Sequence, residues 1–348
     1  MAYTTIDDPE AYFQAKLYTG NAIDDTAITL DGDTDMQPDL IWTKERSQTG
    51  NHNIFDSVRG TSKRLRTETN AAEGTLDPVN QIKSFDSDGF TLGTNNGSNE
   101  DSVTFVAWNW LAGGSASSNS DGSITSSVSA NTTAGFSIVS FTGDDDDAAT
   151  IGHGLGQTPK FIIQKRRDSS GDWQVTFKDK GVGYLNFATV FGTDYGSNGR
   201  LNYTGMTSTT YNFGAGTSNV SSVNLSGATY IAYCFAEISG YSKLGSYTGN
   251  GDADGTFIYT GFKPAFILVK DITGADDNWF IWDNKRDGYN VVNRYLRPNL
   301  NNAEGYYEAI DILSNGFKNR NTSSSANGSE TYIYMAFAEA PFVNSNGV

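Results

Sequence analysis

The sequence of 348 residues contains a single cysteine, an excess of acidic over basic residues, and no long apolar stretch. Cys234 alone can form neither an internal disulfide nor a cysteine-based zinc cluster, so both kinds of scaffold are excluded. The 24 lysines and arginines face 40 aspartates and glutamates, for a formal net charge of −16. Because no basic stripe is available to displace counterions from phosphates, we expect neither nucleic acid nor an anionic membrane surface as a partner.

Signals for membrane insertion and export are also lacking. No stretch approaches the roughly 18 apolar residues that a membrane-spanning helix needs. Residues 1–8 lack the charged and then apolar segments of a cleaved signal peptide. We therefore expect a protein that is made in a cytoplasm, without a signal peptide and without membrane insertion.

Glycine and aromatic residues are abundant instead. The 38 glycines, 18 tyrosines and 20 phenylalanines accompany many Ser, Thr and Asn residues, whereas long stretches of helix-forming residues are missing. This composition is typical of β-strands that are joined by tight turns. The predicted fold class is all-β.

Three stretches of the chain resemble one another. Each opens on an aromatic-Thr-Gly-Asx motif, at residues 18–21, 141–144 and 247–250. A proline then leads into an apolar strand, at residues 38–44, 159–165 and 264–270. Each stretch closes on an aromatic strand, at residues 105–110, 230–235 and 332–337. A spacing of about one hundred residues is enough for a two-layer core and far exceeds the roughly 20–50 residues of a solenoid repeat.

This pattern predicts three tandem antiparallel β-sandwich modules with an internal sequence repeat. In the last closing strand, residues 332–337 are apolar on both alternating faces, so the strand should lie between two layers. The predicted organisation is an N-terminal arm at 1–15, β modules at 16–112, 135–237 and 238–348, and a Gly/Ser/Thr linker or β-ribbon at 113–134.

The connections between the modules differ in length. Asp121-Gly122 is a hairpin signal inside the linker, which favours a short β-ribbon there. Only residues 238–243 separate the second and third modules, which predicts that these two pack rigidly and that the first is attached more loosely. In the arm, Asp8 followed by Pro9 predicts the N-cap and the first residue of a short helical turn.

No arrangement typical of nucleophilic catalysis or phosphate binding occurs. His52 and His153 lack a second His or Cys at ligand spacing, and the glycine-rich surroundings of His153 favour a turn histidine. Cys234 stands in a closing strand, where a buried thiol acts as a small hydrophobic side chain. Nucleophile-elbow and Walker motifs are missing, so no catalytic residue is predicted and the chain is not expected to be an enzyme.

Two Asp-Arg pairs recur at matching positions of the first and third stretches. Asp56 and Asp283 each follow an aromatic residue, and Arg59 and Arg286 each come three residues later. Paired carboxylates can serve glycoside hydrolysis, but a recurring Asp-Arg pair is better interpreted as a structural ion pair that closes a turn. The second stretch carries Lys178 at the aligned position, which further weakens a catalytic interpretation.

An acidic loop follows each opening motif, at residues 31–35, 144–147 and 250–255. The last loop begins like an EF-hand, but its twelfth position is Gly261, where a bidentate glutamate is required. We expect solvated surface loops and no cofactor. Calcium bound by Asp252 and Asp254 is the weaker alternative.

Exposed tyrosines could stack on sugar rings. Six of them lie in Asn/Gly/Ser-rich segments: Tyr184, Tyr195, Tyr203, Tyr289, Tyr306 and Tyr307. The stretch from Gly181 to Thr210 differs most between the three copies, so its tyrosines are the ligand-binding candidates.

Several motifs resemble those of a family of structural proteins from marine bacteriophages. They stand at residues 4–9, 18–21, 37–42, 55–60, 85–90, 135–139 and 336–342, among them Gln-Pro-Asp-Leu-Ile-Trp and Phe-Asp-Ser-Val-Arg-Gly. The resemblance covers essentially the full chain. It implies a virion component, commonly labelled tail-fibre-like or lectin-like, and it provides no catalytic residues.

The expected function is that of a phage virion structural protein, a tail-fibre or tail-tip component that contacts a glycan or receptor on the host surface. Other virion proteins and further copies of the same chain are the expected partners, and the virion is the expected location. A capsid decoration or head-fibre protein without a receptor role is the alternative. A glycan-degrading enzyme is the third and weakest interpretation.

Overall fold

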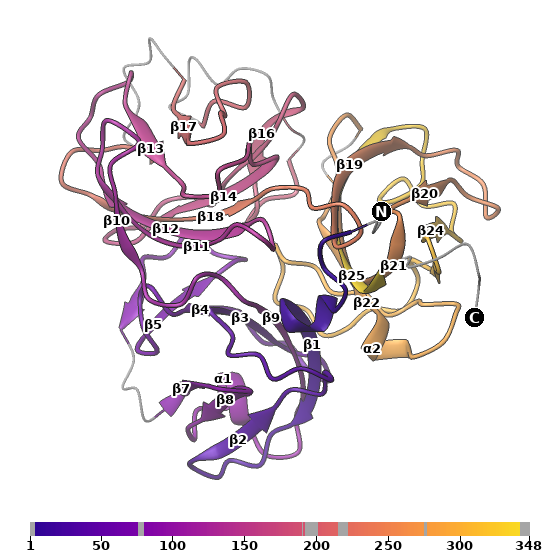
Figure 1. The fold of residues 1–348 in the computed structure, drawn as a ribbon. Helices are drawn as coiled ribbons and strands as arrows, with labels where there is room; N and C mark the ends of the chain where they lie inside the picture. Colours follow the sequence, from indigo (N-terminus) through magenta and orange to yellow (C-terminus); the bar gives the residue numbers. More distant parts are fainter. Residues whose placement is uncertain are drawn as a thin grey trace.

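The computed structural model describes residues 4–75, 80–189, 191, 201–214, 222–274 and 277–341. In these residues the chain is nearly all β, with several antiparallel sheets, as the composition predicted. Figure 1 shows three groups of strands, in indigo to purple, magenta to pink, and orange to yellow, arranged around a common centre. No helix in the described part of the chain is long and apolar enough to cross a membrane.

The first large sheet has the order β1-β9-β3-β4-β5-β6. Its strands are β1 (Phe13–Thr19), β9 (Thr104–Trp110), β3 (Leu40–Glu45), β4 (His52–Asp56), β5 (Lys63–Arg66) and β6 (Gly74–Thr75). A small sheet covers one face of it and consists of β2 (Thr26–Thr29), β8 (Gly89–Leu92) and β7 (Ile82–Asp86). A short helix, α1 (Asn96–Asn99), precedes β9.

The second large sheet has the order β10-β11-β12-β18-β14-β15-β16. Its strands are β10 (Ser117–Asn119), β11 (Ser126–Asn131), β12 (Phe136–Thr142), β18 (Thr229–Phe235), β14 (Phe161–Arg166), β15 (Gln174–Phe177) and β16 (Gly181–Tyr184). The small sheet beside it pairs β13 (Thr150–Gly152) with β17 (Thr210–Asn212). Within the segment 113–134, β10 and β11 form an antiparallel ribbon that extends this large sheet through β12.

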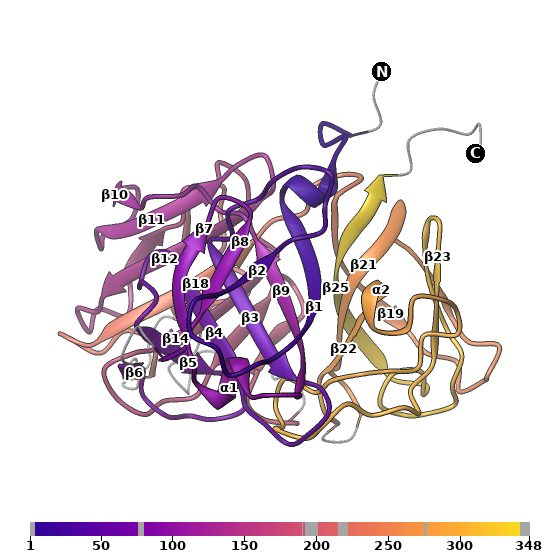
Figure 2. The ribbon, with the colours of Figure 1, turned by 90° about the horizontal axis from the view of Figure 1, so that it is seen from below.

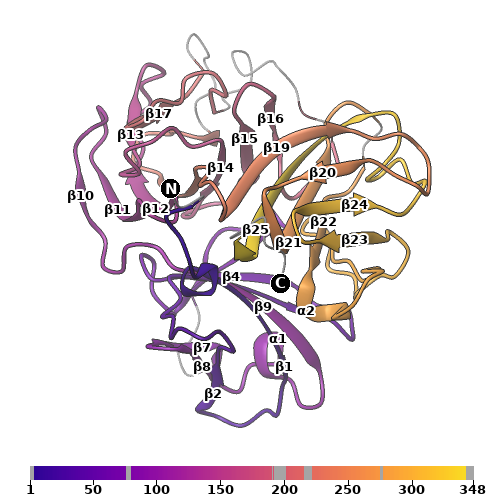
Figure 3. The ribbon, with the colours of Figure 1, turned by 45° about the vertical axis from the view of Figure 1, so that its right-hand side comes forward.

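The third large sheet has the order β19-β25-β21-β22. Its strands are β19 (Ser242–Thr248), β25 (Thr331–Pro341), β21 (Phe262–Asp271) and β22 (Phe280–Asp283), which runs directly into α2 (Asn284–Asp287). The small sheet contains β20 (Phe257–Tyr259), β24 (Gly316–Asn319) and β23 (Ile310–Leu313). Figure 3 shows this small sheet on the outer side of the large one, away from the centre of the molecule.

Opening and closing strands are neighbours in every large sheet. The shared order is opening strand, closing strand, proline-led strand and the strand that follows it: β1-β9-β3-β4, β12-β18-β14-β15 and β19-β25-β21-β22. The aromatic ring of each opening motif stacks on the first aromatic ring of the closing strand. Ring centroids are 5.0 Å apart for Tyr18 and Phe105, 5.1 Å for Phe141 and Tyr230, and 5.0 Å for Tyr247 and Tyr332.

The closing strands are buried on both faces. In β25, Tyr332, Tyr334 and Ala336 belong to the core beneath the small sheet, and Ile333, Met335 and Phe337 belong to a different, central core. The prediction that this strand lies between two layers is confirmed.

The central core is shared by all three large sheets. Phe13 of the first sheet lies 5.3 Å from Phe337 of the third, between ring centroids. Phe235 of the second sheet lies 6.0 Å from Phe337 and 6.5 Å from Trp110 of the first. The expectation that residues 16–112 are attached more loosely is therefore wrong, because their sheet contributes to the same buried cluster as the other two.

The N-terminal arm joins the beginning of the chain to its last strand. The short helix η1 (Pro9–Ala11) has Asp8 as its N-cap, whose side chain accepts a hydrogen bond from the backbone N–H of Glu10. The predicted cap is thus confirmed. The arm packs on β25, and Figure 2 shows η1 and the end of β25 at the same edge of the molecule. Nearby, the rings of Tyr12 and Tyr241 meet edge to face at 5.9 Å.

Candidate functional site

The two Asp-Arg pairs are buried ion pairs. Asp56 accepts hydrogen bonds from the backbone N–H and the Nε of Arg59, at 2.8 and 2.5 Å. Asp283 likewise accepts hydrogen bonds from the backbone N–H and the Nε of Arg286, at 3.0 and 2.6 Å. All four side chains are fully buried. The interpretation as a structural pair that closes a turn is confirmed.

Each ion pair continues into a network that crosses to a second sheet. From the first sheet, Arg59 also binds Glu73 at 3.2 Å, and Glu73 binds Arg167 of the second sheet at 2.8 Å. Tyr233 of the second sheet donates its hydroxyl proton to Asp56 at 2.7 Å.

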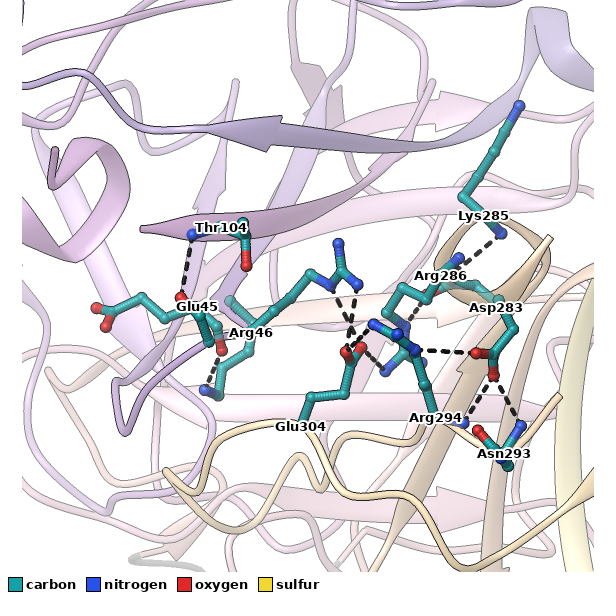
Figure 4. A network of polar contacts seen from close by, with 12 residues as sticks. Glu45, Arg46, Thr104, Asp283, Lys285, Arg286, Asn293, Arg294 and Glu304 are labelled. Atoms are coloured by element: carbon teal, nitrogen blue, oxygen red, sulfur yellow. Dashed lines mark hydrogen bonds and ion pairs between the residues drawn. The ribbon is translucent and has the colours of Figure 1, made fainter. Parts of the chain in front are cut away.

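The second network joins the third sheet to the first in the same way. Arg286 binds Glu304 at 3.2 Å, and Glu304 binds Arg46 of the first sheet at 3.2 Å. Trp108 of the first sheet donates its indole N–H to Asp283 at 3.0 Å. Figure 4 shows the carboxylate of Glu304 between the guanidinium groups of three arginines, the third being Arg294.

Neighbouring charges shift the pKa values of two groups in the first network, Arg59 and Glu73. Burial opposes the positive charge of Arg59, but Asp56 together with Tyr233 and Glu73 outweighs this effect and raises the pKa of Arg59. Burial would also raise the pKa of Glu73, yet hydrogen bonds from Arg167 and the charge of Arg59 lower it. The first network therefore holds two sheets together through charged groups that satisfy one another.

At the matching contact between the second and third sheets, apolar residues take these positions instead. The strand register pairs Phe177 with Phe161, just as it pairs Asp56 with Leu40. Phe177, and not Lys178, therefore occupies the position of the buried aspartates, which corrects the alignment made from the sequence. Across the contact, Met335 stands where the other closing strands carry Trp108 and Tyr233, as the registers of the three closing strands show.

An apolar crevice marks this third contact. It is lined by Phe161, Phe177, Leu268, Trp279, Ile333, Tyr334 and Met335. Phe177 thus stands in place of the aspartate on one side of the contact. Met335 stands in place of the hydrogen-bond donor on the other side. Because a buried carboxylate without a partner is costly, the two replacements belong together.

His52 is a buried structural residue. It pairs with Lys44 in the strand register, and its Nδ1 accepts a hydrogen bond from the indole N–H of Trp42 at 2.9 Å. Burial, together with the charge of Lys44, lowers the pKa of His52 well below its ordinary value, so the imidazole is neutral. Because Nδ1 is the acceptor, the proton of the neutral ring is on Nε2.

The buried His153 and Cys234 are uncharged as well. The Nδ1 of His153 accepts from the backbone N–H of Leu155 at 3.2 Å, and its Nε2 lies 3.3 Å from the carbonyl oxygen of Thr207. Burial lowers the pKa of His153 and raises that of the Cys234 thiol. Backbone groups on both sides of the imidazole agree with a turn histidine, and the thiol lies in the core beneath the second small sheet.

The acidic loops are largely exposed, and the first and the last of them are paired with basic residues. Asp254 forms salt bridges with Lys318 and Arg320, and Lys318 lowers the pKa of Asp254. One carboxylate oxygen of Asp252 accepts the backbone N–H of Asp254 at 2.8 Å. Within the described ranges, no three His, Cys, Asp or Glu side chains are grouped so that they could hold a metal ion.

Three buried asparagines hold the segments that directly follow the opening motifs, and the sequence arguments missed them. Asn99, Asn224 and Asn327 are fully buried. Their side-chain amides donate to carbonyl oxygens after the opening motifs, at 2.9 Å to Ile23, 2.8 Å to Asp146 and 2.8 Å to Asp252. The signal for them is an asparagine five or six residues before the first aromatic residue of each closing strand.

The glycines of the opening motifs are required by the same arrangement. A Cβ atom on Gly20, Gly143 or Gly249 would lie 2.2, 2.4 or 1.9 Å from a backbone carbonyl oxygen. In each case this oxygen belongs to the residue after the buried asparagine. The recurrence of Thr-Gly therefore reflects a close approach of two backbones.

Within the described residues, the exposed tyrosines lie in the third part of the chain. Tyr289 and Tyr307 are each 87% exposed, and Tyr306 is 51% exposed. The candidates from the second stretch differ: Tyr184 and Tyr203 are half-buried, and Tyr195 lies outside the described residues. The expectation that the second stretch presents its tyrosines is thus not met by Tyr184 and Tyr203.

A polar pocket opens beside Tyr289. It has a volume of about 230 Å³ and is lined by Lys263, Asn284, Gly288, Tyr289, Asn290, Val292, Ile312 and Glu339. Glu339 accepts a hydrogen bond from the Nδ2 of Asn284 at 2.6 Å and forms a salt bridge with Lys263 at 2.5 Å. The Oδ1 of Asn284 is buried and finds no hydrogen-bond partner among the described residues. The pocket therefore combines an aromatic rim with a paired ammonium and carboxylate, those of Lys263 and Glu339.

Comparison with known proteins places the whole assembly in one family. The model of a family described as "Domain of unknown function (DUF7483)" matches residues 8–341. The chain belongs to this family. The matched range runs from the N-cap of η1 to the end of β25, so the family is defined by all three large sheets together. Neither the curated proteins nor the solved structures include a match.

Proposed function

We propose that the chain is a structural protein of a bacteriophage particle, a tail-fibre or tail-tip component that contacts the host surface. One structural observation supports this proposal: the exposed Tyr289, Tyr306 and Tyr307 lie on loops of a body whose three large sheets share one core. Loops on a rigid scaffold are where proteins commonly place their recognition contacts. The resemblance of the sequence motifs to marine phage structural proteins points the same way.

We also propose that the body consists of three tandem β-sandwich modules, at residues 16–112, 135–237 and 238–348, that repeat one unit. The common strand order and the three stacked aromatic pairs support this division. Other virion proteins and additional copies of the chain are the proposed partners. Sedimentation of the purified protein would measure the number of copies in the assembly.

Cryo-electron microscopy of intact particles tests the proposed location. Density for this fold at the tail, in the few copies typical of a fibre, is the expected result. Hundreds of copies on the capsid would instead identify a decoration protein and would refute the tail assignment.

Incubation of the protein with host polysaccharide tests the enzymatic alternative. We expect no oligosaccharide release, because the buried carboxylates Asp56 and Asp283 are bound by arginines and lie at contacts between sheets. Release of oligosaccharides that persists in an Asp56→Asn, Asp283→Asn double variant would place the activity elsewhere and would contradict the proposed function.

A further inference from the structure

The pocket beside Tyr289 has the chemistry of a carbohydrate site. One face of a pyranose ring is apolar and its edge carries hydroxyl groups, so a site for it needs an aromatic surface next to polar groups. The ring of Tyr289 is 87% exposed, and Asn284 and Glu339 lie in the same pocket.

The polar groups of the pocket can form hydrogen bonds with hydroxyl groups of a ligand. A hydroxyl group both donates and accepts, so it can complete a donor and an acceptor at once. The ammonium of Lys263 supplies the donor, and the carboxylate of Glu339 supplies the acceptor. The Oδ1 of Asn284 is buried and lacks a partner among the described residues, so a ligand hydroxyl reaches it only if the Asn284 side chain turns toward the pocket.

Asn290 shapes the pocket but is not available to a ligand. Its side-chain Nδ2 donates to the carbonyl oxygen of Ile312 at 2.8 Å, and its Oδ1 accepts from the backbone N–H of Ile312 at 2.8 Å. Both halves of the amide are therefore used to fix one wall. The ligand contacts are left to Tyr289, Asn284 and the Lys263–Glu339 pair.

The charge and the volume of the pocket restrict the class of ligand further. Lys263 and Glu339 neutralise each other, and the net charge of −16 repels anionic polymers at long range. A volume of about 230 Å³ is below the roughly 300–1,000 Å³ of sites that enclose a drug-sized ligand. We propose that this pocket binds one neutral hexose unit of a surface glycan, a proposal that rests on the proposed host-contacting function.

Ligand-observed saturation-transfer NMR tests the pocket directly. The probes are the methyl glycosides of glucose, galactose, mannose and N-acetylglucosamine, with sialyllactose as the anionic comparison. We expect at least one neutral glycoside to bind the wild-type protein with a Kd of about 1–10 mM and sialyllactose to bind more weakly. Absence of binding by all four neutral glycosides, or a preference for sialyllactose, would refute the inference.

Two exposed tyrosines provide a matched pair of variants. Tyr289→Ala should weaken binding about tenfold, because it removes the stacking surface. Tyr307→Ala removes a ring that is equally exposed but does not line the pocket, so its affinity should equal that of the wild type. Glu339→Gln should also weaken binding, by a smaller factor. Equal affinities for the Tyr289 variant and the wild type would rule out this pocket.

Binding of labelled protein to host cells separates this inference from the proposed function. If wild-type protein binds cells and the Tyr289 variant binds them equally well, the pocket is refuted and the host-contacting function stands. If neutral glycosides bind the pocket but the protein binds no cells and is absent from the tail, the proposed function is refuted and the saccharide site stands.

Discussion

Loss of the Asp283 carboxylate should destabilise the protein severely, because it leaves the buried cation of Arg286 without its main partner. The carboxylate accepts hydrogen bonds from Nε of Arg286 at 2.6 Å, from the indole of Trp108 at 3.0 Å, and from two backbone N–H groups at 3.0 and 3.1 Å. In Asp283→Ala, the guanidinium of Arg286 should keep two other partners. These are Glu304 and the carbonyl oxygen of Ile281, which lie 3.2 and 2.8 Å away in the wild-type structure.

The magnitude follows from these partners. Removing one member of a buried ion pair costs about 3–5 kcal/mol when the other charge is left uncompensated. Because Glu304 still neutralises part of the charge, we expect the lower part of this range, about 3 kcal/mol. Asp283→Asn keeps a side-chain oxygen for the backbone N–H groups, so its cost should be smaller, about 2 kcal/mol.

Urea unfolding measures this loss, with urea chosen because it adds no ionic screening. Tryptophan fluorescence and far-ultraviolet circular dichroism should give one coincident transition, because the three large sheets share a core. The matched control is Asp24→Ala, which breaks an exposed pair with Lys83 and should cost less than about 1 kcal/mol.

Two outcomes would refute this reasoning. One is a loss for Asp283→Ala that does not exceed the loss for the Asp24 control. The other outcome concerns the double variant Asp283→Ala, Arg286→Leu. This variant leaves no unpaired buried cation, and Glu304 keeps Arg46 and Arg294 as partners. The double variant should be more stable than the sum of the single losses predicts, by about 1–2 kcal/mol. Simple additivity would show that the two residues are not coupled.

Three further predictions concern buried polar groups. Asn327→Ala should cost about 2–3 kcal/mol in urea unfolding, because it leaves buried carbonyl oxygens without donors. His52 has a lowered pKa, so the native imidazole should stay neutral in an NMR titration while unfolded chains take up a proton below about pH 6.5. Stability should therefore fall as the pH falls below that value, and native protonation near pH 6.5 would contradict it. Burial lowers the pKa of Lys44 and of Lys165 to about 8, so stability should rise between pH 8 and about pH 10, where only the unfolded state still holds the proton. Lys44→Met should reduce this rise in stability by about 2 kcal/mol. Urea midpoints at several pH values measure the rise. An unchanged dependence of stability on pH would count against a buried charge on Lys44.

The sequence predicted the local elements well where the chemistry is local. The N-cap at Asp8 and the Asp-Arg turns depend on residues within three or four positions of each other, and both are present in the structure. The hairpin between β7 and β8 turns at Asp88-Gly89, a pair typical of tight turns, and Gly89 has a positive φ of 120°.

The sequence did not predict positions that depend on register. Phe177 and Lys178 are adjacent, and a shift of one residue exchanges the two faces of a strand. Only the ladder between β14 and β15 shows that Phe177 faces the central core and takes the place of the aspartates. The pocket beside Tyr289 was missed for a related reason, because Lys263, Asn284 and Glu339 come from β21, α2 and β25 and no spacing in the sequence connects them.

By itself, the sequence determined that this protein is a β protein whose closing strands are apolar on both faces, since alternation along a strand is a property of neighbouring residues. It did not determine what covers each face. The tertiary structure decided that the outer faces meet small sheets and that the inner faces meet one another in a single core. The physical reason is that apolar surface is buried without directional preference, whereas the choice of partner is fixed by specific contacts such as Asp283 with Trp108 and Phe177 with Met335.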